Sequence, residues 1–239
     1  IYMKINGFQK LTLLDFPEKM ACIIFTAGCN FRCPFCHNAS LVTHIDNTFD
    51  YTEEDIFSYL EKRKGLLEGV CITGGEPLLQ PDIEEFIRKI KAMGYAVKLD
   101  TNGSFPKKLK DLVSKGLVDY VAMDVKNSKE KYALTCGKTV FDLSKIIESV
   151  DFLKEGNVPY EFRTTVAEEL HTPGDFAAIG QWLTELDPGC KAEKFFIQPY
   201  VDRDSVLTGG LHTPTGETLQ KMAAALRPYV KAVNIRGMD

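Results

Sequence analysis

The sequence predicts an α/β fold and, within that class, a partial (β/α)6 TIM-like barrel. Short runs of β-branched and apolar residues alternate with helical patterns at fairly even spacing, which is typical of βα units and a mostly parallel sheet. A length of 239 residues is enough for one such barrel. We therefore expect a single domain over residues 1–239, with a lead-in at 1–19, the barrel core at 20–200, and a C-terminal helix and short strand at 201–239.

Turn and capping signals separate the predicted elements. Thr52 and Asp55 are spaced as in a capping box and precede apolar residues at helical spacing, so a helix is expected there. Later apolar stripes end at Gly94, Gly116 and Gly156, as helices commonly do. The strands are expected at 21–26, 69–73, 96–100, 120–125, 160–166 and 194–199, with a short last one at 232–235.

Charge and cysteine content narrow the class of protein. A formal net charge of −4 argues against a nucleic-acid partner bound through phosphate neutralisation. No apolar run reaches membrane-spanning length, and the first residues do not resemble a signal peptide. Seven cysteines, an odd number with three clustered, suit a reducing compartment better than a secreted disulfide framework. We expect a cytoplasmic protein with neither a membrane nor a nucleic-acid partner.

Three cysteines, Cys29, Cys33 and Cys36, lie within eight residues directly after the first predicted strand. Three thiolates on a four-iron cluster leave one iron without a protein ligand, where chemistry can take place. Structural zinc is the alternative, but it takes four ligands, and His37 adjoins Cys36 too closely to serve easily. Disulfide bonds are a third and weaker interpretation. The remaining cysteines have no paired ligand spacing: Cys22, Cys71, Cys136 and Cys190.

Glycine and polar residues follow the other predicted strands, at the carboxyl ends where parallel barrels place their active sites. The pair Gly74-Gly75 is by itself no more than a turn signal, although glycine also lets a ligand approach the backbone closely. Charged residues at strand ends are commonly plain surface charges, and Arg163 could be an edge residue that extends to solvent. Because these glycine and polar residues would all lie at the same edge of the sheet, we nevertheless expect a binding site there. The residues in these positions are Gly74, Gly75, Glu76, Asp100, Thr101, Asn102, Asp124 and Lys126, and Arg163 lies within the fifth predicted strand.

The remaining histidines and one cysteine suggest no chemistry. His44, His171 and His212 stand in polar stretches and are expected to face solvent. Cys71, on the strand that leads to the glycine pair, is expected to be a small buried core residue.

The CxxxCxxC spacing, with the aromatic Phe35 just before its last cysteine, resembles the signature of radical S-adenosylmethionine (SAM) enzymes. The longer run 28–38 and the lead-in segments 6–10 and 14–17 resemble the activating proteins of glycyl radical enzymes. Within them, the chain is most similar to the anaerobic ribonucleoside-triphosphate reductase activating branch, with pyruvate formate-lyase activating enzyme as near kin. The resemblance spans nearly the whole chain.

This resemblance implies a radical SAM barrel and an oxidoreductase of anaerobic metabolism. Such an enzyme reductively cleaves SAM at a [4Fe–4S] cluster to a 5′-deoxyadenosyl radical, which installs a glycyl radical on a partner enzyme. The implied protein partners are a glycyl radical enzyme as substrate and a flavodoxin or ferredoxin-like electron donor.

The resemblance also implies residue roles. Cys29, Cys33 and Cys36 would bind the cluster and serve catalysis. Phe35 and main-chain groups near His37 would contact the adenine. The remaining SAM-binding residues would be Gly74, Gly75 and Glu76 of a GGEP motif, Asn102, and Lys126 and Arg163 at the SAM carboxylate. A Na⁺ or K⁺ ion would bind at Asp100, Thr101, Met123 and Asp124.

One position departs from pyruvate formate-lyase activating enzyme. Val201 stands where that enzyme has a histidine, and a valine cannot hydrogen-bond SAM. This departure favours the reductase branch. Three alternatives stay open: an activase for pyruvate formate-lyase or another glycyl radical enzyme, a radical SAM enzyme for a small molecule, and an iron–sulfur electron carrier or zinc-binding module.

Overall fold

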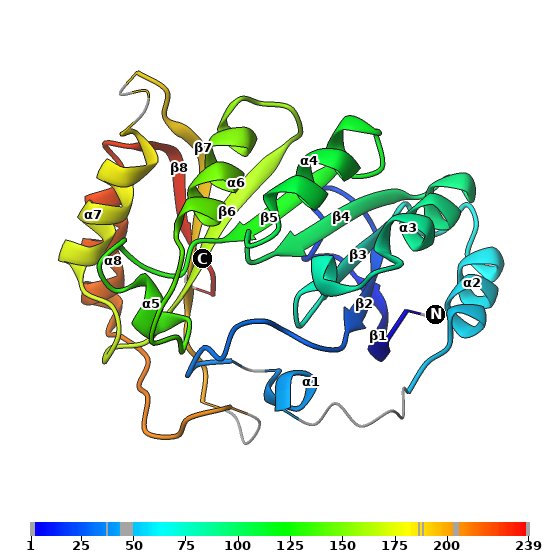
Figure 1. Ribbon diagram of the computed structural model, residues 1–239, viewed down its shortest axis with the longest axis horizontal. Helices are drawn as coiled ribbons and strands as arrows, with labels where there is room; N and C mark the ends of the chain where they lie inside the picture. Colours follow the sequence, from blue (N-terminus) through cyan, green and yellow to red (C-terminus); the bar gives the residue numbers. More distant parts are fainter. Residues whose placement is uncertain are drawn as a thin grey trace. The chain divides into compact units, whose positions relative to one another are not determined.

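The computed structural model describes residues 3–36, 38–43, 50–185, 187, 189–202 and 206–237 (Figure 1). Contacts divide the chain into two compact units. Unit 1 comprises Ile1–Asn30, Asn38–Ala122 and Asn157–Pro159, and unit 2 comprises Phe31–His37, Met123–Gly156 and Tyr160–Asp239. The predicted site residues are distributed over both units. The organisation of the chain as a single domain stays a prediction.

Unit 1 is built on parallel strands with one antiparallel strand at its edge. β1 pairs antiparallel with β2, and β2, β3 and β4 are parallel neighbours. Asp119 donates its backbone N–H to the carbonyl of Val97 at 2.8 Å, which joins the start of β5 to β4. The strands are β1 (Ile5–Thr12), β2 (Ala21–Thr26), β3 (Gly69–Gly74), β4 (Ala96–Thr101) and β5 (Tyr120–Asp124), the last of which belongs to unit 1 as far as Ala122.

The helices of unit 1 begin and end where the sequence signals lie. Thr52 and Asp55 form the predicted capping box at the start of α2, with the Asp55 N–H donating to Thr52 Oγ1 at 3.1 Å. Gly94 follows the end of α3 with a φ of 93°, a conformation that favours glycine. The helices are α1 (Ala39–Thr43), α2 (Glu53–Lys62), the short 3-10 helix η1 (Pro77–Leu79), α3 (Ile83–Ala92) and α4 (Pro106–Ser114).

Unit 2 carries parallel strands and the C-terminal helices. β6, β7 and β8 are parallel neighbours, and Val125, just after β5, donates its N–H to the carbonyl of Arg163 on β6 at 2.8 Å. Helices α7 and α8 lie side by side (Figure 1). The elements are α5 (Tyr132–Thr135), α6 (Ser144–Lys154), β6 (Tyr160–Val166), α7 (Pro173–Leu183), β7 (Ala192–Pro199), α8 (Gly216–Leu226) and β8 (Val230–Ile235).

Strand β1 and the starts of β7 and β8 differ from the prediction. The lead-in forms β1, which lies at an edge and keeps several polar positions exposed, so its sequence lacks the apolar run of a buried strand. β7 and β8 each begin two residues earlier than expected. The second residue of each strand is an exposed charged residue, Glu193 in β7 and Lys231 in β8, and the two side chains pair at 2.5 Å. These charges interrupt the apolar run by which a buried strand is identified in the sequence. All seven predicted strands are otherwise present, which confirms the α/β class with parallel strands.

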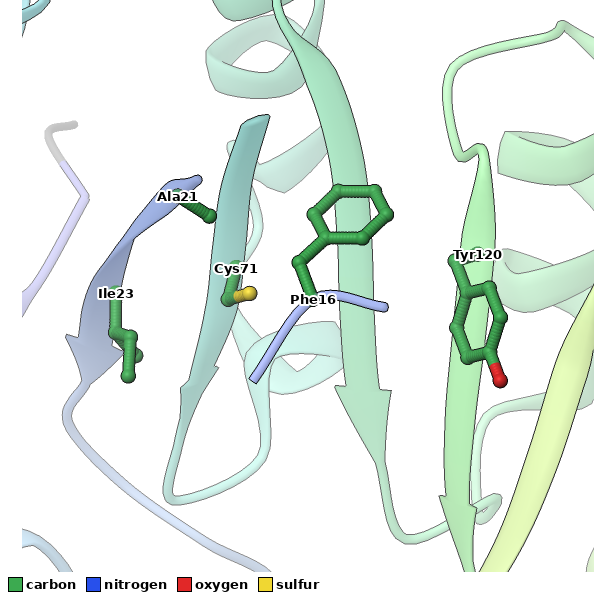
Figure 2. Close-up of a cluster of buried hydrophobic side chains, with 5 residues drawn as sticks. All are labelled: Phe16, Ala21, Ile23, Cys71 and Tyr120. Carbon is green, nitrogen blue, oxygen red and sulfur yellow. The ribbon is translucent and has the colours of Figure 1, made fainter. Parts of the chain in front are cut away.

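A small apolar cluster lies against the first strands of unit 1 (Figure 2). The lead-in contributes Phe16, which packs with Ala21, Ile23, Cys71 and Tyr120. Cys71 is 1% exposed, so its prediction as a buried core residue is confirmed. The segment between β1 and β2 therefore anchors the sheet by burying an aromatic ring.

Candidate active site

The cysteine loop continues from β2 and crosses from unit 1 into unit 2. Cys29 belongs to unit 1, whereas Cys33 and Cys36 belong to unit 2, where the Cys36 N–H donates to the carbonyl of Cys33 at 3.0 Å. All seven cysteines lie among the described residues, and none forms a disulfide bond. Within the described ranges, no three His, Cys, Asp or Glu side chains form a group that could hold a metal ion. The shared ligand role of the three cysteines thus stays a prediction, and His37 lies outside the described residues.

Cys33 is buried among groups that favour its thiolate. A hydrogen bond from Cys136 lowers the pKa of Cys33, burial opposes that shift, and the Lys126 ammonium lowers the pKa further. Since the thiolate is the form that binds iron, this environment fits a cluster ligand. Cys22 is different, because burial raises its pKa to about 12. Burial likewise raises the pKa of Cys71, so these two thiols stay protonated in the core.

Cys136 and Gly137 hold the loop in place, a role that the sequence did not reveal. Arg32 donates its backbone N–H to the carbonyl of Cys136 at 2.9 Å. Gly137 has a φ of 65°, and a Cβ at this position would lie 2.1 Å from the carbonyl oxygen of Arg32. Cys136 stands alone in the sequence, without ligand spacing, so only the fold shows that it supports Cys33.

The glycine pair after β3 packs against the segment that leads into Cys29. A Cβ on Gly75 would lie 2.0 Å from the carbonyl oxygen of Gly28. Gly74 has a φ of 118°, and a Cβ there would lie 2.3 Å from the backbone nitrogen of Thr26. Both glycines are therefore required by close backbone approach. Their predicted contact with SAM stays a prediction.

Glu76 is fully buried, and its carboxylate joins two strand ends of unit 1. It accepts hydrogen bonds from Thr101 Oγ1 at 2.8 Å, the Asn102 N–H at 2.7 Å and the Leu78 N–H at 3.1 Å. Asn102 in turn places its side-chain amide 3.9 Å from Cys29 Sγ and 2.9 Å from Asn30 Oδ1. The structure thus brings Glu76, Asn102 and Cys29 together in one network that positions the first cysteine.

Asp124, Lys126 and Arg163 form a charged group in unit 2. Asp124 accepts from Lys126 Nζ at 2.8 Å and from Arg163 Nε at 3.1 Å. Burial disfavours the ammonium of Lys126, but the nearby Asp124 and Cys33 outweigh it and raise its pKa. Lys126 Nζ also lies 5.7 Å from the centre of the Phe35 ring. An ammonium and a guanidinium thus converge at one point of unit 2, and both are groups that can bind a carboxylate ligand.

His171 lies in the interior, so its prediction as a solvent-facing residue is wrong. It is 2% exposed and follows β6 in a turn whose backbone it helps to hold. The carbonyl of Lys126 can only accept, so His171 Nε2 donates to it at 2.9 Å, and Nδ1 accepts the Ala167 N–H at 3.2 Å. Burial lowers the pKa of His171, which keeps the ring neutral. Its ring centre lies 6.1 Å from that of Phe35.

The other two histidines have separate outcomes. His212 is exposed, as predicted, and is paired with Glu169 at 2.5 Å. His44 lies outside the described residues. No signal in the sequence indicates the burial of His171, because the polar residues around it are typical of an exposed loop.

The predicted monovalent cation fits the described residues poorly. In unit 1, Asp100 is already paired with Lys98 Nζ at 2.6 Å, and Thr101 Oγ1 is engaged with Glu76. In unit 2, Met123 is buried in β5 and Asp124 has two side-chain cations. The carboxylates of Asp100 and Asp124 are therefore already paired with cationic side chains of this chain.

Comparisons with known proteins identify the family of this chain. Residues 23–170 match the model of the radical SAM superfamily. A protein of Methanocaldococcus jannaschii that is provisionally named a glycyl-radical enzyme activating enzyme is 31% identical over 241 residues, covering 98% of this chain and 96% of that protein. The pyruvate formate-lyase-activating enzyme of Staphylococcus epidermidis is 27% identical over 210 residues, covering 82% of this chain and 80% of that enzyme. The chain therefore belongs to the radical SAM superfamily.

Within that superfamily, the chain is a homologue of glycyl-radical enzyme activating enzymes, so the predicted resemblance to these activating enzymes is confirmed. Radical SAM enzymes use a [4Fe–4S] cluster and SAM, so the prediction of these two cofactors is confirmed as well. Among the described residues, no helix is long and apolar enough to cross a membrane.

Solved structures support the fold. A domain of pyruvate-formate lyase-activating enzyme from Bacteroides vulgatus matches with a TM-score of 0.56 at 19% identity, covering 71% of this chain and 99% of that domain. A radical SAM methyltransferase from Sphaerobacter thermophilus matches with a TM-score of 0.70 at 14% identity, covering 95% of this chain and 69% of that enzyme. These likenesses confirm the α/β partial barrel of the radical SAM type.

Proposed function

We propose that the chain installs a glycyl radical on a partner enzyme, and that this partner is an anaerobic ribonucleoside-triphosphate reductase. The observation that carries the activase part is the similarity to the Methanocaldococcus jannaschii activating enzyme, which extends over 98% of the chain. Val201 supports the reductase as partner, because it stands where pyruvate formate-lyase activating enzyme has a histidine. Its side chain is 49% exposed and offers no hydrogen bond to a ligand.

Cys29, Cys33 and Cys36 would hold the [4Fe–4S] cluster. The network of Glu76 and Asn102 positions Cys29, while Cys136 and Lys126 favour the thiolate of Cys33. A cluster held there would supply one electron, taken from an external donor, for the reductive cleavage of SAM to methionine and a 5′-deoxyadenosyl radical, and this radical would take a hydrogen atom from a backbone glycine of the partner.

The SAM carboxylate would bind at Lys126 and Arg163. Both cations already converge on Asp124, so their head groups are held in place before the ligand arrives. Phe35 lies beside Lys126 and would contact the adenine, and the backbone of Gly74, Gly75 and Glu76 would hold the SAM amino group. The electron would come from a flavodoxin or ferredoxin-like donor.

A second candidate partner is pyruvate formate-lyase. The Staphylococcus epidermidis enzyme named for activating it is 27% identical over 82% of this chain. The two candidates share the same chemistry at the cluster and differ only in the protein that receives the radical.

Anaerobic mixing of the cluster-reconstituted chain with each purified candidate partner, SAM and dithionite tests the proposal. We expect the electron paramagnetic resonance (EPR) doublet of a glycyl radical on the reductase, formed together with 5′-deoxyadenosine. The Cys33→Ala variant is the matched control and should give neither product. A radical on pyruvate formate-lyase and none on the reductase would contradict the proposed partner and leave the activase assignment standing.

A further inference from the structure

A buried lysine in unit 1 lies next to a carboxylate that has no role in the proposed mechanism. The Lys98 side chain on β4 is 1% exposed, and its ammonium lies 2.6 Å from Asp100 Oδ1. The Asp100 side chain is 14% exposed. A buried ammonium needs a counter-charge, because losing water without one costs far more than any packing gain returns.

The strand register places the stem of Lys98 next to apolar residues, so the ammonium has no route to solvent on that side. Ile23, Cys71 and Lys98 are direct neighbours on β2, β3 and β4. Ile23 and Cys71 belong to the apolar cluster around Phe16, which lies toward the start of these strands (Figure 2). Because side chains two residues apart share a face of a strand, Lys98 reaches from this cluster toward Asp100.

The neighbouring hydroxyl is also committed to the protein. Thr101 Oγ1 donates to Glu76 Oε1 at 2.8 Å and accepts the Gly103 N–H at 3.1 Å. Its position is therefore set by the turn that it stabilises. An ion seeking oxygen ligands at this turn would find a carboxylate with an ammonium beside it and a hydroxyl held by other groups.

We infer that the ammonium of Lys98 is the resident counter-ion of Asp100, and that this chain binds neither Na⁺ nor K⁺ there. A monovalent ion on Asp100 would place a second positive charge beside the ammonium in a buried setting. Its repulsion is weakly screened at that depth. Lys98 is thus a positioning residue that fixes Asp100 at the end of β4 independently of the salt in solution.

Sodium binding to the full-length, anaerobically purified wild-type chain gives a direct test. We expect the protein to add no saturable contribution to the ²³Na relaxation rate, and therefore no contribution that added K⁺ removes. A saturable excess that is displaced by K⁺ and lost in Asp100→Asn would overturn the inference, because Na⁺ would then share Asp100 with Lys98.

The charge role of Lys98 is tested by thermal melting. Lys98→Met removes the ammonium but keeps most of the apolar stem, so we expect the melting temperature to fall by about 5–10 °C. The double variant Lys98→Met/Asp100→Asn removes both charges and should recover most of that loss. A double variant as unstable as the single one, or a single variant as stable as wild type, would overturn the counter-ion role.

A second lysine–aspartate pair of unit 1 provides the matched control. Lys91 and Asp119 lie 2.7 Å apart, but their side chains are 27% and 38% exposed. Lys91→Met should therefore lower the melting temperature much less than Lys98→Met. If Lys98→Met does not fold, the double variant and the sodium measurement on the wild type still decide the question.

Discussion

The strand ends of the two units are used differently. In unit 1, Glu76, Thr101 and Asn102 have their polar atoms engaged in short hydrogen bonds within the protein. In unit 2, Lys126 and Arg163 converge on a single carboxylate, and the pKa values of Cys33 and Lys126 are shifted by their neighbours. The strand ends of unit 1 thus hold one another in place, and those of unit 2 bring cationic side chains together at the proposed SAM carboxylate site. Substitutions in the first should mainly cost stability, and those in the second should mainly cost binding and turnover.

The largest effect is expected at Cys33. Cys33→Ala removes a predicted cluster ligand, so 5′-deoxyadenosine formation should fall by about a thousandfold or more. Cys71→Ala is the matched control, because that buried thiol lies in the apolar cluster of unit 1. Its product yield should stay close to wild type. Chromatographic measurement of 5′-deoxyadenosine checks both variants, and full activity in Cys33→Ala would remove the basis of the cluster assignment.

Glu76 tests the structural role of unit 1. Glu76→Ala leaves three buried donors without their acceptor, so the free energy of unfolding should drop by about 3 kcal/mol or more. Glu84→Ala, at a half-exposed carboxylate of α3 that pairs with Arg88 and Lys115, should lower it much less. Denaturant unfolding of both variants gives the comparison. Equal stabilities would show that the Glu76 network does not hold the strand ends.

Lys126 tests the binding role of unit 2. Lys126→Ala should weaken SAM binding by about tenfold, because one of two cations for the carboxylate is lost. The iron content should stay near wild type. Lys129→Ala removes a partly exposed lysine that pairs with Glu185, and it should leave the SAM affinity unchanged. Equilibrium binding of SAM measures this, and an unaltered affinity in Lys126→Ala would contradict the proposed contact.

The smallest effect is expected at His171 and concerns pH. Burial lowers the folded pKa of His171 below its unfolded value of about 6.5. As the pH falls past that value, the unfolded chain takes up a proton that the folded chain does not, so stability is lost. His171→Gln should therefore lose less stability than wild type on acidification.

His212 gives the opposite sign and serves as the control. The hydrogen bond to Glu169 raises the pKa of His212, so its contribution is present at low pH and is lost as the pH rises. His212→Gln should thus lose more stability than wild type on acidification. Unfolding curves at about pH 7.5 and about pH 5.5 separate the two cases. The same response in both variants would contradict the neutral, buried state of His171.

The fold was largely predictable because its signals are local. The buried parallel strands are continuous apolar runs in the sequence. Thr52 and Asp55, which lie within four residues, indicate the start of a helix. β1 was missed because an edge strand keeps polar residues exposed, which leaves no apolar run. Glu193 and Lys231 hid the starts of β7 and β8 for the same reason.

The candidate site was predictable only where a motif has its own spacing. The cysteines, the glycine pair and Lys126 can be identified from the chain alone. Cys136, His171 and Lys98 cannot, because their roles come from long-range contacts with Cys33, the Lys126 carbonyl and the interior of the sheet. A buried lysine beside Asp100 looks, in sequence, like an ordinary surface charge.

The most direct test of radical SAM chemistry at the cysteine loop uses the iron-reconstituted, dithionite-reduced wild-type chain. SAM is added under anaerobic conditions, and 5′-deoxyadenosine is followed together with the low-temperature EPR spectrum of the cluster. We predict that the spectrum changes on addition of SAM and that 5′-deoxyadenosine appears. Bound iron with no response to SAM, or zinc in place of iron, would contradict the account.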